Sequence, residues 1–174
     1  MTRKDDLAKQ VVDACLLRGS FTLRSGAVSD YYFDKYQICS NPRLLDMVSG
    51  RMADLVPLET EVVAGLELGA VPLATMISCI TMTPAVFVRK ERKKYGTARL
   101  IEGAEYVGKR VCLVEDVITS GGAVKEAIEA FRADDVDPIA VVSAIFRGAE
   151  DMPDILGVPR YSLFYDADLK RYYE

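Results

Sequence analysis

The stretch VCLVEDVITSGG, residues 111–122, decides the fold of this 174-residue chain. Its first half is an almost unbroken apolar run, which is typical of a central strand that is covered on both faces of a sheet. Its hydroxyl and glycine residues lead into a segment where apolar residues recur at helical spacing, namely Val124, Ala127, Ile128 and Phe131. The stretch therefore predicts a buried strand, a tight turn and the start of a helix.

Two adjacent carboxylates, Glu115 and Asp116, fall at the carboxyl end of the predicted strand. Ligands of open α/β sheets bind at that edge, and hydroxyls and glycines at a helix start offer free backbone N–H groups to a phosphate. Carboxylates beside a phosphate cradle suit a sugar phosphate, because they accept hydrogen bonds from ribose hydroxyls. The alternative is an ordinary strand with an acidic end and a glycine turn.

Short apolar runs alternate with helical patterns around this stretch. The pattern predicts strands at 61–66, 84–88 and 139–146, a helix at 70–80, and a further short strand at 161–165. This alternation predicts an α/β fold with a mostly parallel sheet flanked by helices.

Four other segments complete the prediction. Apolar spacing indicates helices near residues 5–18 and 42–55, the second with Pro42 in its first turn. A polar and aromatic connector, 21–36, lies between them. Residues 89–109 lack a core-forming period, and a connection of that length is either functional or a sign that an element has been missed.

Length and composition indicate one domain, residues 1–174, with a net charge of −4 from 22 basic and 26 acidic residues. This balance gives no general attraction for nucleic acid. The chain contains no histidine, so histidine-dependent nucleophilic mechanisms and histidine-ligated metal sites are excluded. The four cysteines are expected to be reduced and buried: Cys15, Cys39, Cys79 and Cys112. The chain shows no signal-type segment and no apolar stretch of membrane-spanning length, which predicts a soluble cytoplasmic protein without a membrane partner.

The strand, acidic pair and glycine turn of residues 111–122 resemble the signature of the type I phosphoribosyltransferases. The run VRKERKKYGTARLIEG, residues 88–103, resembles the catalytic loop of the orotate phosphoribosyltransferases within that family, and FTLRSG, residues 21–26, resembles a segment near their N-terminus. On composition alone a charge run is more often a solvated face. The resemblance favours a mobile cationic lid that neutralises departing pyrophosphate.

Further matches concern the base. Tyr32 and Phe33 match the family's aromatic pair, with core packing as an equally supported alternative. Arg147, at the end of a predicted strand, matches the arginine that recognises the base. A lone arginine there is more often part of a surface ion pair, but orotate carries a carboxylate that a guanidinium binds in bidentate fashion.

The resemblance implies the type I phosphoribosyltransferase fold, with a small N-terminal hood mainly from residues 19–40 and a mobile catalytic loop at 89–103. It implies Mg²⁺-dependent transfer of the phosphoribosyl group from 5-phosphoribosyl 1-pyrophosphate (PRPP) to orotate. The products would be orotidine 5′-monophosphate and pyrophosphate, in the biosynthesis of UMP. A homodimer that shares the loop 89–103 between subunits is also implied.

The resemblance also assigns roles to individual residues. The catalytic residues would be Lys93, Glu115 and Asp116. The residues that would bind PRPP are Arg24, Arg89, Lys90, Lys93, Tyr95, Glu115, Asp116, Val117, Ile118, Thr119, Ser120, Gly121, Gly122 and Ala123. The residues that would bind orotate are Tyr32, Phe33, Thr119 and Arg147. Mg²⁺ would be held mainly by PRPP and water, with no direct protein ligand.

The sequence departs from the family pattern at four positions. Arg24 replaces a lysine, Tyr95 replaces the loop histidine, and Glu115 replaces an aspartate. Gly69 stands where many bacterial members have a lysine that contacts pyrophosphate. Because Tyr95 can donate a hydrogen bond to phosphate but is not a cation near neutral pH, the resemblance does not fix the turnover rate or its pH dependence.

Three other functions stay open. One is phosphoribosyl transfer to uracil, adenine, hypoxanthine or xanthine, against which Arg147 and the FTLRSG segment favour an acidic pyrimidine. Another is a non-catalytic regulator that senses PRPP and binds RNA or DNA, which the cationic loop and the acidic net charge disfavour. A purely structural α/β protein is the third, and the convergence of three motifs disfavours it.

The segment GAEYVGK, residues 103–109, matches the first part of a phosphate-binding Walker A pattern. Arg110 stands where that pattern requires Ser or Thr, and the segment precedes a predicted strand instead of following one. It is therefore predicted to be a turn.

Overall fold

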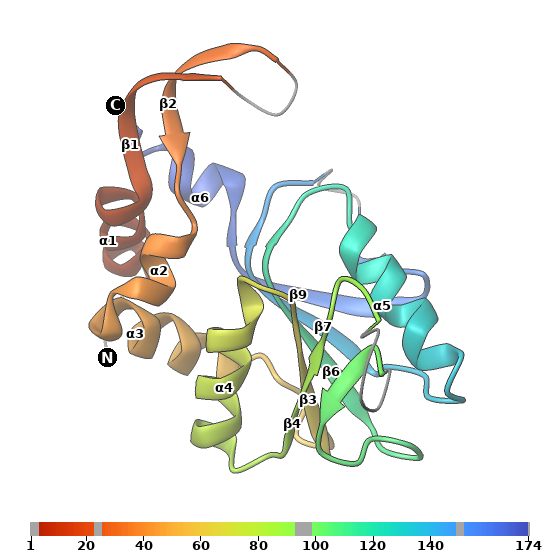
Figure 1. Cartoon of the computed structure of the whole chain (residues 1–174). Coiled ribbons are helices and arrows are strands. Elements are labelled where there is room, and N and C mark those ends of the chain that lie inside the picture. Colours follow the sequence, from red (N-terminus) through yellow and green to blue (C-terminus); the bar gives the residue numbers. More distant parts are fainter. Residues whose placement is uncertain (1–3, 23–25, 93–98, 149–151, 174) are drawn as a thin grey trace.

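A computed structural model describes residues 4–22, 26–92, 99–148 and 152–173 (Figure 1). Within these residues the centre is a seven-stranded sheet of order β5-β4-β3-β6-β7-β9-β8. Its central strands are parallel, and the two edge strands run antiparallel to their neighbours, which confirms the expected mostly parallel sheet. The strands are β3 (Val62–Leu66), β4 (Ala85–Val88), β5 (Ile101–Gly103), β6 (Val111–Ile118), β7 (Ala140–Phe146), β8 (Asp154–Ile155) and β9 (Val158–Tyr165).

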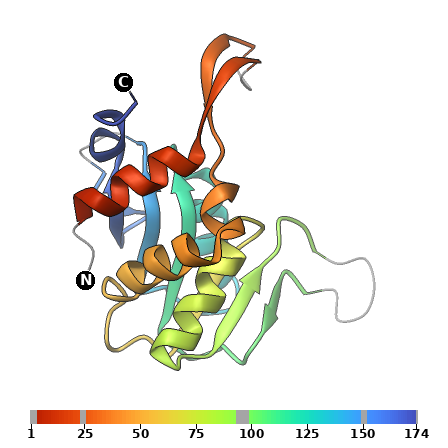
Figure 2. The ribbon, with the colours of Figure 1, turned by 90° about the vertical axis from the view of Figure 1, so that its left-hand side faces the viewer.

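Helices cover both faces of the sheet. α4 (Ala70–Thr81) connects β3 to β4 on one face, and α5 (Gly122–Arg132) connects β6 to β7 on the other (Figure 1). α3 (Pro42–Ala53) and α1 (Lys4–Cys15) lie on the same side as α4 (Figure 2). Because both faces are covered, β7 is buried along its whole length. The four apolar residues of α5 that the sequence places on one face are all buried, as predicted.

The strand order reverses between β3 and β6. From β3 the chain proceeds to β4 on one side, and from β6 it proceeds to β7 on the other. This is the switch point of an open sheet, where the carboxyl ends of two neighbouring strands leave a crevice. Gly65 in β3 lets α4 pack closely there, because a Cβ atom on Gly65 would lie 2.7 Å from Cβ of Ala74.

The start of α3 has the capping that its sequence predicts. The side-chain oxygen of Asn41 accepts hydrogen bonds from the backbone N–H groups of Arg43 (3.1 Å) and Leu44 (3.2 Å), and Pro42 occupies the first turn. The helix ends at Ala53, slightly before the predicted end.

The first helix is shorter than predicted. The prediction of a helix over 5–18 is wrong beyond Cys15, where the chain enters the strand β1 (Leu16–Thr22). The cause of the error is Leu16, which continues the apolar spacing of the helix although it is only half-buried in the strand.

The connector 21–36 contains an unpredicted strand, β2 (Val28–Phe33), which pairs antiparallel with β1. The backbone N–H of Asp34 donates to the carbonyl of Cys15 (2.8 Å) and closes the base of this hairpin. The hairpin projects away from the rest of the molecule (Figure 2). The short helix α2 (Tyr36–Ser40), also unpredicted, follows it.

The long connection 89–109 contains the edge strand β5, which pairs antiparallel with β4. At Gly103 the backbone has a φ of 123°, and a Cβ atom would lie 2.6 Å from the carbonyl oxygen of Ala85. The chain then turns, with the N–H of Lys109 donating to the carbonyl of Tyr106 (3.0 Å), and enters β6. The prediction of a turn before a strand is confirmed from Ala104 onward, whereas Gly103 is the last residue of β5.

The four cysteines are free, as predicted, but their burial differs. Cys15 and Cys112 are buried and Cys39 is half-buried, whereas Cys79 is exposed, so the expectation of burial is wrong for Cys79. It lies on α4, outside the set of α4 residues that pack into the core. The last helix, α6 (Asp166–Lys170), was not predicted. In the part of the chain that the structure describes, no helix is long and apolar enough to cross a bilayer.

Candidate active site

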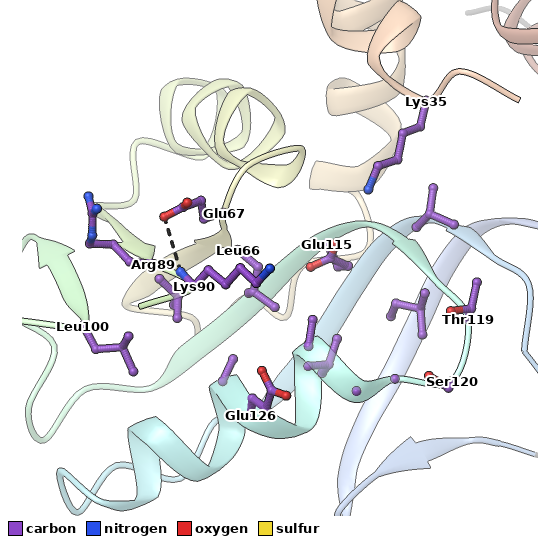
Figure 3. Close-up of a pocket in the computed structure, with 18 of the residues that line it drawn as sticks. Lys35, Leu66, Glu67, Arg89, Lys90, Leu100, Glu115, Thr119, Ser120 and Glu126 are labelled. Atoms are coloured by element: carbon purple, nitrogen blue, oxygen red, sulfur yellow. Dashed lines mark hydrogen bonds between the residues drawn. The ribbon is translucent and has the colours of Figure 1, made fainter. Parts of the chain in front are cut away.

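A pocket of about 760 Å³ opens at the carboxyl ends of β3, β4 and β6 and at the start of α5 (Figure 3). This is the switch point of the sheet, and the volume falls within the range of small-molecule sites. Four stretches that are far apart in the sequence line the pocket with Glu115, namely 35–36, 66–67, 88–90 and 117–124. The pocket therefore joins the predicted acidic strand end, the glycine turn and the beginning of the charged run.

The turn between β6 and α5 lines one end of the pocket with residues 117–123. Gly121, with φ 75° and ψ 10°, precedes the first residue of α5 in a left-handed conformation that favours glycine. Among the residues that the structure describes, no side chain caps the start of this 11-residue helix. Its first backbone N–H groups, together with the hydroxyls of Thr119 and Ser120, are therefore available to an anion at the positive end of the helix dipole.

Glu115 presents its carboxyl group to the same pocket. Its Oε2 atom is buried and has no hydrogen-bond partner among the described residues. Burial raises the pKa of Glu115 well above the usual range of a carboxyl group, and the nearby Asp116 raises it further. The surroundings of Glu115 therefore favour the neutral carboxyl group, whose oxygens can accept or donate a hydrogen bond to a ligand.

Asp116 does not line the pocket, although its carboxyl group is close enough to that of Glu115 to raise the pKa of Glu115. It is 3% exposed and pairs with Lys35, whose Nζ atom lies 3.0 Å from Oδ1 and 2.8 Å from Oδ2. The backbone N–H of Val117 also donates to Oδ1 (2.6 Å). Sequence reasoning missed Lys35, because a single lysine after an aromatic segment carries no signal that separates it from a surface residue.

Arg89 and Lys90 both line the pocket, as their predicted role requires. The backbone N–H of Lys90 donates to Oε2 of Glu67 (3.3 Å), a pocket residue that sequence reasoning also missed. The side chain of Lys90 extends toward the side of the pocket that holds Glu115, whereas that of Arg89 points away from it (Figure 3). Lys93, Tyr95 and Arg24, the other cations and donors of the prediction, lie outside the described residues.

Of the predicted base-binding residues, Thr119 lines this pocket, whereas Tyr32, Phe33 and Arg147 do not. Arg147 follows β7, and its guanidinium lies 5.5 Å from the centre of the Phe33 ring. Its Nε atom donates to Oδ1 of Asp166 (2.9 Å) and its Nη2 atom to the hydroxyl of Tyr173 (3.4 Å), so a ligand carboxylate would compete with Asp166 or share the guanidinium with it. Tyr32 is 45% exposed and packs on Phe21, with ring centres 5.7 Å apart.

Comparison with known proteins adds independent findings. Residues 37–162 match the family model of the phosphoribosyl transferase domain. An orotate phosphoribosyltransferase of Nocardioides sp. is 49% identical over 147 residues, which cover 84% of this chain and 82% of that protein. A crystal structure of Mycobacterium tuberculosis H37Rv orotate phosphoribosyltransferase in complex with Fe(III) dicitrate aligns with a TM-score of 0.82, 33% identity, and coverage of 95% of this chain and 98% of the other. A crystal structure of the same enzyme in complex with PRPP aligns with a TM-score of 0.78, 30% identity, and coverage of 96% and 98%.

Proposed function

Because the chain belongs to the orotate phosphoribosyltransferases, we propose that it transfers the phosphoribosyl group of PRPP to orotate and releases pyrophosphate, a step in the synthesis of UMP. One observation carries the proposal: a single pocket combines an uncapped helix start at 119–123 with a buried carboxyl group at Glu115 and a lysine at Lys90. These are the partners that a sugar with phosphate groups at both ends requires.

The pocket gives PRPP one direction. The turn 119–123 binds the 5′-phosphate through backbone N–H groups, and the ribose lies over the end of β6, where Glu115 meets its hydroxyls. The pyrophosphate then lies toward the ends of β3 and β4, where Arg89 and Lys90 line the pocket. The charged loop 89–103, with Lys93 and Tyr95, closes over it in this proposal.

In the reaction, the bond between C1′ and the pyrophosphate oxygen breaks, and its electron pair leaves with pyrophosphate. A ring nitrogen of orotate forms the new bond to C1′ and gives up its proton. Positive charge develops at C1′ in the transition state, and the negative charge of Asp116 favours it, while Glu115 holds the ribose hydroxyls and cations favour the leaving group. Exclusion of water by the closed loop protects the reactive centre.

Mg²⁺ is part of the proposal. No group of three or more His, Cys, Asp or Glu side chains gathers as a metal site among residues 4–22, 26–92, 99–148 and 152–173. The buried, unpartnered oxygen of Glu115 is the hard donor that suits Mg²⁺, so the pocket fits an ion bound mainly through PRPP and water. The ion would supply positive charge to the pyrophosphate, and Glu115 would accept hydrogen bonds from its waters.

For the base, Arg147 and Phe33 support an acidic pyrimidine. The guanidinium is already paired with a carboxylate, that of Asp166, and lies near the ring of Phe33. A carboxylate on a planar ring satisfies both groups at once, whereas uracil and the purine bases carry no carboxylate. Tyr32 and Thr119 complete the proposed contacts with orotate.

A homodimer that shares loop 89–103 between subunits is also proposed, with the cytoplasm as the location. The hairpin supports an interface, because it exposes Leu17 (40%), Val28 (72%) and Tyr32 (45%). Mixing Lys93→Ala subunits with Asp116→Asn subunits tests the sharing. Recovery of activity in the mixture is expected, and no recovery despite confirmed subunit exchange would count against it.

The enzymatic proposal is tested by following orotate absorbance with purified protein, PRPP and Mg²⁺, beside parallel assays with uracil and purine bases. Orotate loss that requires every component, and that falls sharply in Lys90→Met, is the expected result. Lys109→Met is the matched control, because Lys109 pairs with Glu61 (3.7 Å) away from the pocket. Consumption of another base would mean that this base, and not orotate, is the substrate. Binding of PRPP without turnover of any base would favour a non-catalytic regulator.

A further inference from the structure

Lys35 is a cation at the pocket to which the resemblance assigns no role. It precedes α2 and reaches down to the end of β6, with its ammonium group directed into the pocket (Figure 3). Its side chain is 37% exposed, whereas that of its partner Asp116 is 4% exposed. Burial lowers the pKa of Lys35, but the hydrogen bond and the charge of Asp116 outweigh it, so the pKa lies above its usual value and the group stays charged.

Gly69 lies next to the same carboxylate, that of Asp116. A Cβ atom on Gly69 would lie 1.7 Å from Oδ2 of Asp116, the oxygen to which Nζ of Lys35 is 2.8 Å away. The side chain of Asp116 therefore fills the space in which a longer residue at position 69 would begin. A cation reaches this part of the site from Lys35, just before α2, whereas with Asp116 in this place a side chain at position 69 would clash with its carboxylate.

The direction of PRPP in the proposed function brings its pyrophosphate to this region. The 5′-phosphate occupies the start of α5, so the other end of the ribose faces the ends of β3 and β4, beside residues 67–69. An ammonium group has three donors, of which one is engaged in the hydrogen bond to Oδ1 of Asp116 and another faces Oδ2 at ion-pair distance. The third donor remains for an oxygen of the ligand.

We propose that Lys35 binds the pyrophosphate group of PRPP while it remains paired with Asp116, and thus supplies from α2 the positive charge that position 69 lacks. This inference rests on the proposed function, since it takes the direction of PRPP from it. Lys35 is then a binding residue for the leaving group, and Asp116 is the residue that positions it.

Binding of two probes separates this role from a structural one. In Lys35→Met, the dissociation constant for inorganic pyrophosphate, measured by calorimetry, is expected to rise about tenfold or more, as the loss of a charged hydrogen bond implies. The dissociation constant for ribose 5-phosphate is expected to change less than about twofold, since this molecule has no pyrophosphate group. Lys35→Arg should keep most of the pyrophosphate affinity, and Lys109→Met should match the wild type.

An equal loss of affinity for both probes would mean that Lys35 acts only through Asp116. No loss of affinity for either probe would mean that Lys35 does not contribute to binding. Both outcomes overturn the inference. A measurement on the unmodified sequence guards against misfolding of the variant. Pyrophosphate should slow labelling of Lys35 by an amine-reactive reagent, read by mass spectrometry, and ribose 5-phosphate should not. Equal protection by pyrophosphate and ribose 5-phosphate would also overturn the inference.

The failure of this inference can be distinguished from the failure of the proposed function. If the wild type turns over orotate while Lys35→Met binds pyrophosphate normally, only this inference fails. If the wild type neither binds pyrophosphate nor turns over any base, the proposed function itself fails.

Discussion

The two ends of the candidate site are built differently. The proposed phosphate end is one continuous turn, 119–123, which offers the backbone N–H groups at the uncapped start of α5. The base end is assembled from β2, the end of β7 and the start of α6, through the side chains of Phe33, Arg147 and Asp166. The first is open to a ligand, whereas in the second the guanidinium of Arg147 already pairs with Asp166, which competes with a ligand carboxylate. Substitutions at the phosphate end should therefore affect every phosphate ligand strongly, and those at the base end should affect orotate alone.

The largest effect is expected at Gly121. Gly121→Ala places a Cβ atom on a left-handed residue, 3.3 Å from Ile155, and should tilt the N–H groups that face the phosphate. Loss of two charged hydrogen bonds would lower kcat/KM for PRPP by about 100-fold. Gly157→Ala is the control, because Gly157 has a similar φ of 82° with open space around it. It should lower the melting temperature without changing kcat/KM, and equal kinetic losses in both variants would contradict a preformed cradle.

A smaller and more selective effect is expected at Arg147. Arg147→Ala should raise KM for orotate by about 30-fold and leave KM for PRPP within about twofold, as the loss of a paired guanidinium implies. Arg132→Ala is the matched control, because Arg132 pairs with Asp137 at 2.8 Å on the surface. Steady-state kinetics, with orotate and PRPP varied in turn, measures both KM values for each variant. A rise in KM for PRPP of the same size would remove the distinction between the two ends.

A change in the opposite direction is expected at Asp166. Asp166→Asn removes the negative charge that competes with orotate for Arg147, so KM for orotate should fall by about two- to fivefold. The same kinetic assay measures it. An increase in KM would instead show that Asp166 holds Arg147 in the geometry that the base requires.

The smallest effect concerns the stability of the ligand-free protein as a function of pH. Folding raises the pKa of Glu115, so this residue stabilises the fold at low pH and loses that contribution as pH rises from the ordinary carboxyl range through the raised pKa. Glu115→Gln should therefore gain stability relative to the wild type between about pH 5 and about pH 9, because in this range the unfolded wild type releases a proton that the folded wild type retains. Melting temperatures of both proteins across this range check it. A constant difference would mean that Glu115 titrates normally.

The sequence predicted the elements that are contiguous and strongly patterned. The strand β6, the glycine turn and α5 were all expected, because one short segment contains the apolar run, the turn residues and the helical spacing. The cap of α3 is equally local, since Asn41 bonds to N–H groups two and three residues later. Features of this kind depend on neighbours in the chain, which a sequence displays directly.

The features that sequence reasoning missed depend on contacts between distant segments. The hairpin was misjudged because Leu16 fits a helix face as well as a strand. Lys35 could not be identified because its partner, Asp116, is 81 residues away along the chain. The pairing of Arg147 with Asp166 likewise requires the strand order, which places the end of β7 beside β9. No local pattern encodes these distances.

The central claim is tested most directly by ³¹P nuclear magnetic resonance of the protein mixed with PRPP, Mg²⁺ and orotate. The expected result is loss of the PRPP signals and the appearance of free pyrophosphate and orotidine 5′-monophosphate in equal amounts, with no change when orotate is omitted or replaced by uracil. Release of pyrophosphate without formation of the nucleotide, or a reaction that proceeds equally with another base, would contradict it.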